Sequence, residues 1–107
     1  MSIRTLALLL AAATAEIGGT YLIWQGLREG KGPLVAVLGC GVLVGYGVIA
    51  TLQRDPNFGR VLAAYGGVFV AGSIAWGAAV DGFKPDRQDL LGVMICLTGS
   101  MLILAPR

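Results

Sequence analysis

The sequence predicts an all-α integral membrane protein, a bundle of four transmembrane helices that is expected to form dimers. Hydrophobic residues make up 56% of the 107 positions, and only 13% of positions are charged. A soluble domain averages about 25% charged residues, so this chain has too little polar surface for a water-soluble globule. The apolar residues gather in four long segments joined by short connections. The whole chain, 1–107, is therefore expected to be a single membrane domain.

The apolar segments cover 5–27, 33–52, 61–80 and 90–105, and the fourth helix is expected to begin at 89. A helix rises about 1.5 Å per residue, so the first three segments match a hydrocarbon core of ~30 Å. The fourth is short and would need flanking residues or local thinning of the bilayer. The triplet 13–15 resembles a signal-peptide cleavage site, but apolarity continues through Trp24 and favours a spanning helix.

The connections contain ordinary helix-ending and helix-starting residues. The glycine-rich stretch 28–33 ends in a proline suited to the first turn of a helix, and 55–57 is a turn signal. Asp81 is expected to end the third helix. Asp86, with Asp89 three residues later, predicts a capping box. Charged loop residues are expected to be solvated; alternatively, Asp81 or Asp86 pairs with a basic residue at the mouth of a pathway.

Basic residues are balanced between the two sides of the predicted membrane domain. With four spans, both termini lie on one side. That side holds Arg4, Arg54, Arg60 and Arg107, and the other holds Arg28, Lys31, Lys84 and Arg87. The positive-inside rule then gives almost no preferred orientation. We expect copies to insert both ways and to form an antiparallel homodimer, which would restore between chains the inverted symmetry of larger transporters.

Glycine is abundant, with seventeen in the chain, and small residues drive helix association in lipid. Gly92 and Gly99 lie two turns apart on one face of the fourth helix and are predicted to form the dimer interface. The glycines of the second helix, such as Gly41 and Gly45, and those of the third are expected to pack within the chain.

Glu16 is the only charged side chain within any of the apolar segments. Placing a carboxylate at bilayer depth costs roughly 2.5–3.5 kcal/mol on insertion scales, so such a residue indicates a functional site. Its helical neighbours are mostly small, which suggests that it points into the bundle. No Lys or Arg lies at matching depth. The alternative is a hydrogen-bonded core acid without further function.

The residues able to surround Glu16 carry hydroxyl groups or aromatic rings: Thr20, Tyr46, Tyr65 and Trp76. Aromatic faces and a carboxylate both attract positive charge, which predicts a site for a small cationic substrate. Burial without a counter-ion favours the protonated carboxyl, so a proton and a cation would compete for it. Trp24 is equally explained as a residue of the membrane interface.

No other chemistry is indicated. The chain has no histidine and no metal-ligand spacing, and Cys40 and Cys96 fit best as packing residues. We expect no enzymatic activity, no metal, no cofactor and no nucleic-acid partner; the expected surroundings are lipid bilayer and a second chain. Two other functions stay open: a non-transporting membrane subunit of a larger complex, and a small ion channel of dual topology.

The stretch Ala-Glu-Ile-Gly-Gly-Thr-Tyr-Leu at 15–22 resembles the first-helix motif of the small multidrug resistance transporters. The chain is more similar, nearly end to end, to the YnfA-type small membrane proteins, relatives of that family. The segments that carry this closer resemblance are 27–31, 58–60, 63–68 and 80–87.

The resemblance implies an antiparallel dimer of four-helix subunits in the bacterial inner membrane that exchanges protons for cations. Glu16 would bind both proton and substrate, and Gly92 and Gly99 would match the dimer glycines; a paralogous chain could replace the second copy. The multidrug transporters have Trp-Ser-Gly where this chain has Tyr65-Gly66-Gly67. That difference implies a different substrate range.

Overall fold

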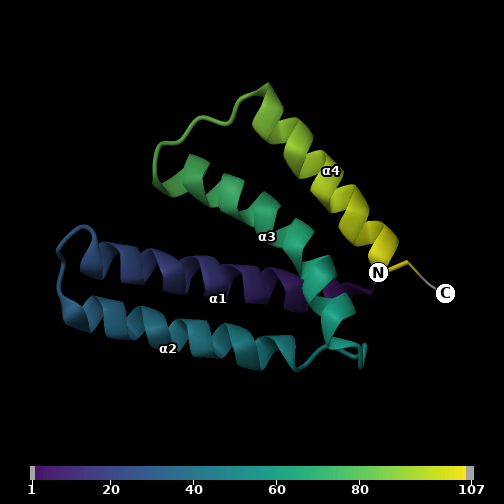
Figure 1. Ribbon diagram of the computed structural model, residues 1–107, viewed down its shortest axis with the longest axis horizontal. Helices are drawn as coiled ribbons and strands as arrows, with labels where there is room; N and C mark the ends of the chain where they lie inside the picture. Colours follow the sequence, from purple (N-terminus) through teal and green to yellow (C-terminus); the bar gives the residue numbers. More distant parts are fainter. Residues whose placement is uncertain (1, 106–107) are drawn as a thin grey trace.

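The computed structural model describes residues 2–105 and folds them into four α-helices (Figure 1). They are α1 (Ile3–Leu27), α2 (Pro33–Ala50), α3 (Phe58–Val80) and α4 (Arg87–Ile103). The first two run antiparallel and side by side, α3 crosses α1, and α4 returns along α3. The all-α prediction is confirmed.

Three of these helices, α1, α2 and α3, are long and apolar enough to cross a membrane. Helix α4 has 17 residues. It therefore extends about 25 Å, less than the ~30 Å of a hydrocarbon core. The lengths and composition of α1, α2 and α3 are those of a multi-pass membrane protein. That α4 also spans the membrane stays a prediction.

The first and third helices begin earlier than the apolar segments that predict them. Helix α1 begins at Ile3 instead of residue 5, because the Ser2 hydroxyl accepts a hydrogen bond from the Thr5 backbone N–H at 3.1 Å. Helix α3 begins at Phe58 instead of Val61, because the Asn57 carbonyl already accepts the Val61 N–H. These first turns are polar or solvated, so hydropathy does not reveal them.

The predicted ends of α2 and α4 differ from the structure by small shifts. Helix α2 ends at Ala50 and not at residue 52, and α4 covers 87–103 and not 89–105. The predicted capping box is confirmed: the Asp89 N–H donates to Asp86 at 2.8 Å, and the Asp86 N–H donates to Asp89 at 3.0 Å. Asp81 caps the end of α3 as predicted, and the following Gly82 has a φ of 70°, which favours glycine.

Glycines bring the backbones of α1 and α2 into direct contact. A Cβ atom on Gly39 would lie 2.5 Å from the Gly19 carbonyl oxygen, and one on Gly26 would lie 2.6 Å from the Ala36 nitrogen. On α3, a Cβ atom on Gly67 would collide with the Cys96 carbonyl and the Ser100 hydroxyl of α4. The pairs α1–α2 and α3–α4 are therefore each in closest contact at glycines, which carry no side chain.

The expectation that Gly41 and Gly45 pack within the chain is wrong. A Cβ atom on either residue would meet nothing within 4 Å. Helix α2 instead turns Gly39 toward α1, so the glycine spacing 41/45 lies on a different face of the helix from the one that packs. For α3 the expectation is confirmed at Gly67, at Gly72 beside the Ile17 side chain and at Gly77 beside Phe83. It is wrong at Gly66, where an added Cβ would meet nothing within 4 Å.

The buried core lies where α3 crosses α1. It consists of Leu9, Ala12, Ala13, Tyr65 and Val68, and none of the large side chains in 2–105 is completely buried. Large apolar side chains instead cover the outside of the bundle, such as Leu34 at 70% and Ile95 at 72% exposed. An outward apolar surface of this kind suits lipid or a second chain.

The two ends of the molecule are formed by different connections. The α1–α2 and α3–α4 loops lie at one end, and the start of α1 and the α2–α3 connection lie at the other (Figure 1). This is the arrangement assumed in counting basic residues, except that Arg107 lies outside the described residues.

In the α2–α3 connection, the Asn57 backbone N–H donates to Asp55 at 2.9 Å and holds the pKa of that carboxyl below its usual range.

Candidate functional site

Glu16 and Tyr65 form a hydrogen bond between the middle of α1 and α3. The Tyr65 hydroxyl donates to the Glu16 carboxylate at 2.5 Å. The Tyr65 side chain belongs to the buried core, so the bond lies at the crossing of the two helices. The Tyr46 ring of α2 packs against Tyr65 with centroids 5.3 Å apart. Three helices thus meet around one carboxylate.

Glu16 has no cationic partner within the part of the chain that the structure describes. The one ion pair found there joins Arg60 to Asp55 at 3.6 Å, in the α2–α3 connection. Glu16 itself takes part in no ion pair among these residues. Its partner is a neutral hydroxyl group, which a proton or a cation can displace without first breaking a salt bridge.

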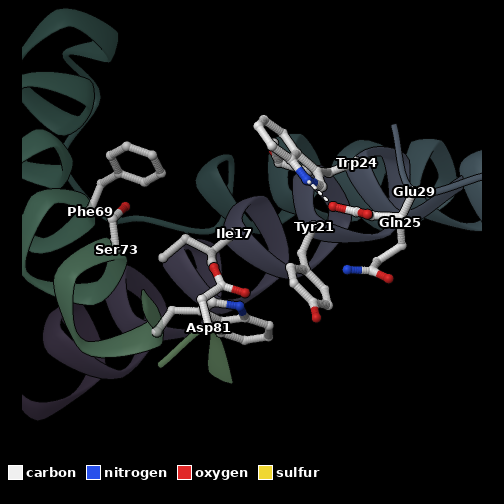
Figure 2. Close-up of a pocket in the computed structure, with 10 residues that line it drawn as sticks. Ile17, Tyr21, Trp24, Gln25, Glu29, Phe69, Ser73 and Asp81 are labelled. Carbon is white, nitrogen blue, oxygen red and sulfur yellow. Dashed lines mark hydrogen bonds between the residues drawn. The ribbon is translucent and has the colours of Figure 1, made fainter. Parts of the chain in front are cut away.

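A cavity of about 450 Å³ lies between α1 and α3, toward the end formed by the α1–α2 and α3–α4 loops (Figure 2). Thr20, four residues after Glu16, lines it together with Ile17. Glu16 itself is not among the lining residues; it lies one helical turn deeper on the same side of α1. The cavity is large enough for a small organic molecule.

The lining of this cavity is aromatic and acidic. The Tyr21 and Trp76 rings pack with centroids 5.6 Å apart and an interplanar angle of 60°. The charged lining residues within 2–105 are Glu29 and Asp81, and both are acidic. Aromatic rings and carboxylates favour a cation and disfavour an anion. The lining aromatic residues are Tyr21, Trp24, Phe69 and Trp76.

Three residues at the end of α1 form a cluster at the mouth of the cavity. The Trp24 indole N–H donates to the Glu29 carboxylate at 3.3 Å, the bond drawn in Figure 2. The guanidinium carbon of Arg28 lies 4.6 Å from the centroid of the Trp24 ring. Sequence reasoning treated Glu29 as a solvated loop residue and missed this contact. The signal was a tryptophan in the last turn of a helix with an acid just beyond it.

The structure groups the predicted site residues into two neighbouring places. Tyr65 bonds to Glu16 and Tyr46 packs against Tyr65. Thr20 and Trp76 instead line the adjacent cavity and, within residues 2–105, form no hydrogen bond with the carboxylate. The predicted dimer glycines, Gly92 and Gly99, lie on α4, and none of the other helices described in 2–105 comes within 4 Å of an added Cβ there. Their role in a dimer stays a prediction.

Removing the Tyr65 hydroxyl is expected to destabilise the fold. Tyr65→Phe keeps the ring in the core but leaves the half-buried Glu16 carboxylate without its donor. We expect the free energy of unfolding to fall by about 1–2 kcal/mol, the range for hydrogen bonds between membrane helices and for an unmade buried bond. Unfolding in mixed detergent micelles, followed by circular dichroism, measures the change.

Tyr21→Phe is the matched control for that substitution. The Tyr21 ring packs against Trp76, and its hydroxyl makes no hydrogen bond with the described residues. We expect a loss below about 0.5 kcal/mol, as for substitutions that remove no contact. Equal losses in the two variants would contradict a stabilising Glu16–Tyr65 bond.

The chain matches the family model described as "Uncharacterised BCR, YnfA/UPF0060 family" over residues 2–107. A UPF0060 membrane protein of Frankia casuarinae is 59% identical over 105 residues, which cover 98% of this chain and 96% of the relative. One of Saccharopolyspora erythraea is 58% identical over 106 residues, with 98% and 96% covered. One of Mycobacterium tuberculosis is 58% identical over 108 residues, with 100% and 98% covered. No solved structure matches the chain significantly.

Proposed function

The chain belongs to the YnfA/UPF0060 family of membrane proteins, and from this premise we propose that it is a proton-coupled efflux transporter of small organic or lipophilic cations. The observation that carries the proposal is Glu16, a carboxylate within an apolar helix that is bonded to a hydroxyl group and to no cation. The adjacent cavity, with its aromatic and acidic lining, gives a cation a route toward it.

Exchange follows from competition for one carboxylate. In the loaded state the Glu16 carboxylate holds the cation; in the return state it holds a proton, and Tyr65 hydrogen-bonds the carboxyl group. A desolvated carboxylate that holds neither a proton nor a cation is unfavourable, so the protein seldom changes its access side with Glu16 charged and empty. Proton entry on one side then releases the cation, and cation binding on the other releases the proton.

We place this chemistry in an antiparallel homodimer, or in a dimer with a paralogous chain, in the bacterial inner membrane. The balanced basic residues support dual insertion, and the open faces at Gly92 and Gly99 would let α4 of a second chain approach closely. Two inverted copies would present equivalent pathways to the two sides, as alternating access requires.

Flux in liposomes tests the proposal. The purified protein is reconstituted with an imposed pH gradient, and uptake of radiolabelled 1-methylpyridinium is measured; this aromatic cation has a fixed charge and cannot carry a proton itself. We expect saturable uptake that follows the gradient and collapses when an ionophore dissipates it. Conductance without saturation would indicate a channel, and neither flux nor conductance would indicate a subunit; both outcomes would overturn the proposal.

A further inference from the structure

We propose that Trp24, Arg28 and Glu29 form a second cation-binding site at the mouth of the cavity, separate from Glu16. In this site the Arg28 guanidinium covers the Trp24 ring until an incoming organic cation replaces it. The inference rests on the proposed function for the class of ligand alone. Trp24 lies eight residues after Glu16, about 12 Å further along the axis of α1, so one small cation cannot contact both residues.

The Trp24 ring already binds a cationic group. The Arg28 guanidinium carbon lies 4.6 Å from the ring centroid, within the ~6 Å over which a ring attracts a cation. Trp24 is 49% exposed and also lines the cavity, so its ring can be reached from outside the molecule and from within the cavity. A ligand arriving from the loop end meets this ring before it reaches Thr20.

Glu29 gives the ring a fixed position and adds negative charge beside it. Its carboxylate accepts the indole N–H at 3.3 Å, so it holds the ring by its edge and does not compete with a cation for the ring face that Arg28 covers. Asp81 lines the same cavity from the end of α3. A cation on Trp24 would therefore lie beside the Glu29 carboxylate and in the same cavity as Asp81, and both negative charges attract it.

Arg28 can leave the ring at little cost. Arg28 is exposed, and within residues 2–105 its side chain contacts the Trp24 ring and forms no ion pair. An exposed cation–π contact is weak, and the released guanidinium is solvated by water. Arg28 thus acts as a tethered competitor that weak ligands fail to displace and better ones replace.

Tryptophan fluorescence reads this site directly, because Trp24 and Trp76 are the two tryptophans of the chain. A Trp76→Phe background leaves Trp24 as the reporter in the liposome-embedded protein. Quenching by 1-methylpyridinium measures cation binding at the mouth, and quenching by acrylamide, a neutral quencher, corrects for exposure of the ring. Circular dichroism verifies that each variant keeps its helices.

In this background, Arg28→Gln is expected to lower the apparent Kd for 1-methylpyridinium about three-fold, because the competitor is gone. Glu29→Gln is expected to raise it about three-fold or more. Lys31→Gln is the matched control: it removes one positive charge from the same loop but not from the Trp24 ring. It should change the Kd by less than half as much as Arg28→Gln.

Equal effects of Arg28→Gln and Lys31→Gln would overturn the site, since Arg28 would then act through general charge alone. An unchanged Kd in Glu29→Gln would also overturn it and would identify Trp24 as a membrane-interface residue. Added to the Trp76→Phe background, Glu16→Gln should leave quenching of Trp24 unchanged. Loss of quenching in that variant would mean a single site, whereas loss of proton-driven flux alone would concern the proposed function.

Discussion

Replacing Glu16 with glutamine is expected to reduce proton-driven uptake of 1-methylpyridinium at least about 100-fold, a loss worth about 2.7 kcal/mol. The amide has nearly the size of the carboxyl group and can still bond to the Tyr65 hydroxyl, so the α1–α3 crossing should persist. It neither releases a proton nor carries the negative charge that attracts a cation. Initial uptake rates in liposomes under a fixed pH gradient measure the effect.

Two further variants make this result specific to Glu16. Glu16→Asp keeps the charge on a shorter side chain and should retain part of the gradient-driven uptake. Asp55→Asn removes a carboxylate from the α2–α3 connection, away from the cavity lining, and should retain all of it. Uptake by Glu16→Gln at the rate of the unmodified protein would rule out Glu16 as the exchange site.

A methyl group at Gly67 is expected to separate α4 from α3. Its Cβ would collide with the Cys96 carbonyl, which is backbone and cannot rotate away, and with the buried Ser100 hydroxyl. Overpacking of this kind costs about 1–3 kcal/mol, and more where backbone must shift. We expect Gly67→Ala to lower the free energy of unfolding by at least about 2 kcal/mol in mixed micelles.

The neighbouring residue provides the comparison. Gly66 lies on the same helix, but a Cβ atom there would meet nothing within 4 Å. Gly66→Ala gains helix propensity, up to about 1 kcal/mol in an exposed helix, and should be neutral or stabilising. A Gly67→Ala variant as stable as Gly66→Ala would show that α3 and α4 do not pack at this contact.

Hydropathy and capping residues were sufficient to predict four helices, because both signals are local. The capping box at Asp86 and the end of α3 at Asp81 follow from residues within one turn. The first turns of α1 and α3 were missed because they are polar or solvated. The face that α2 turns toward α1 was also missed, since Gly39, Gly41 and Gly45 are equally small and only the partner helix distinguishes them.

Glu16 could be identified from the sequence because a charge within an apolar helix is unusual by itself. Its partner was named only as one of several hydroxyl and aromatic residues, and the crossing of α1 and α3 selects Tyr65. The cavity could not be predicted, because it depends on the separation of two helices distant in sequence. Glu29 and Asp81 become part of it only through that separation.

The glycine contacts divide the molecule into two rigid helix pairs. Backbone contact at Gly19 and Gly39 joins α1 to α2, and Gly67 joins α3 to α4, so neither pair can close further or slide easily. The cavity lies between α1 of one pair and α3 of the other, so its width depends on the angle between the two pairs, which the 51–57 connection joins in sequence. Among residues 2–105, Glu16 and Tyr65 make the one hydrogen bond between side chains of the two helix pairs. A change at that carboxylate therefore acts directly on the contact between the two helix pairs.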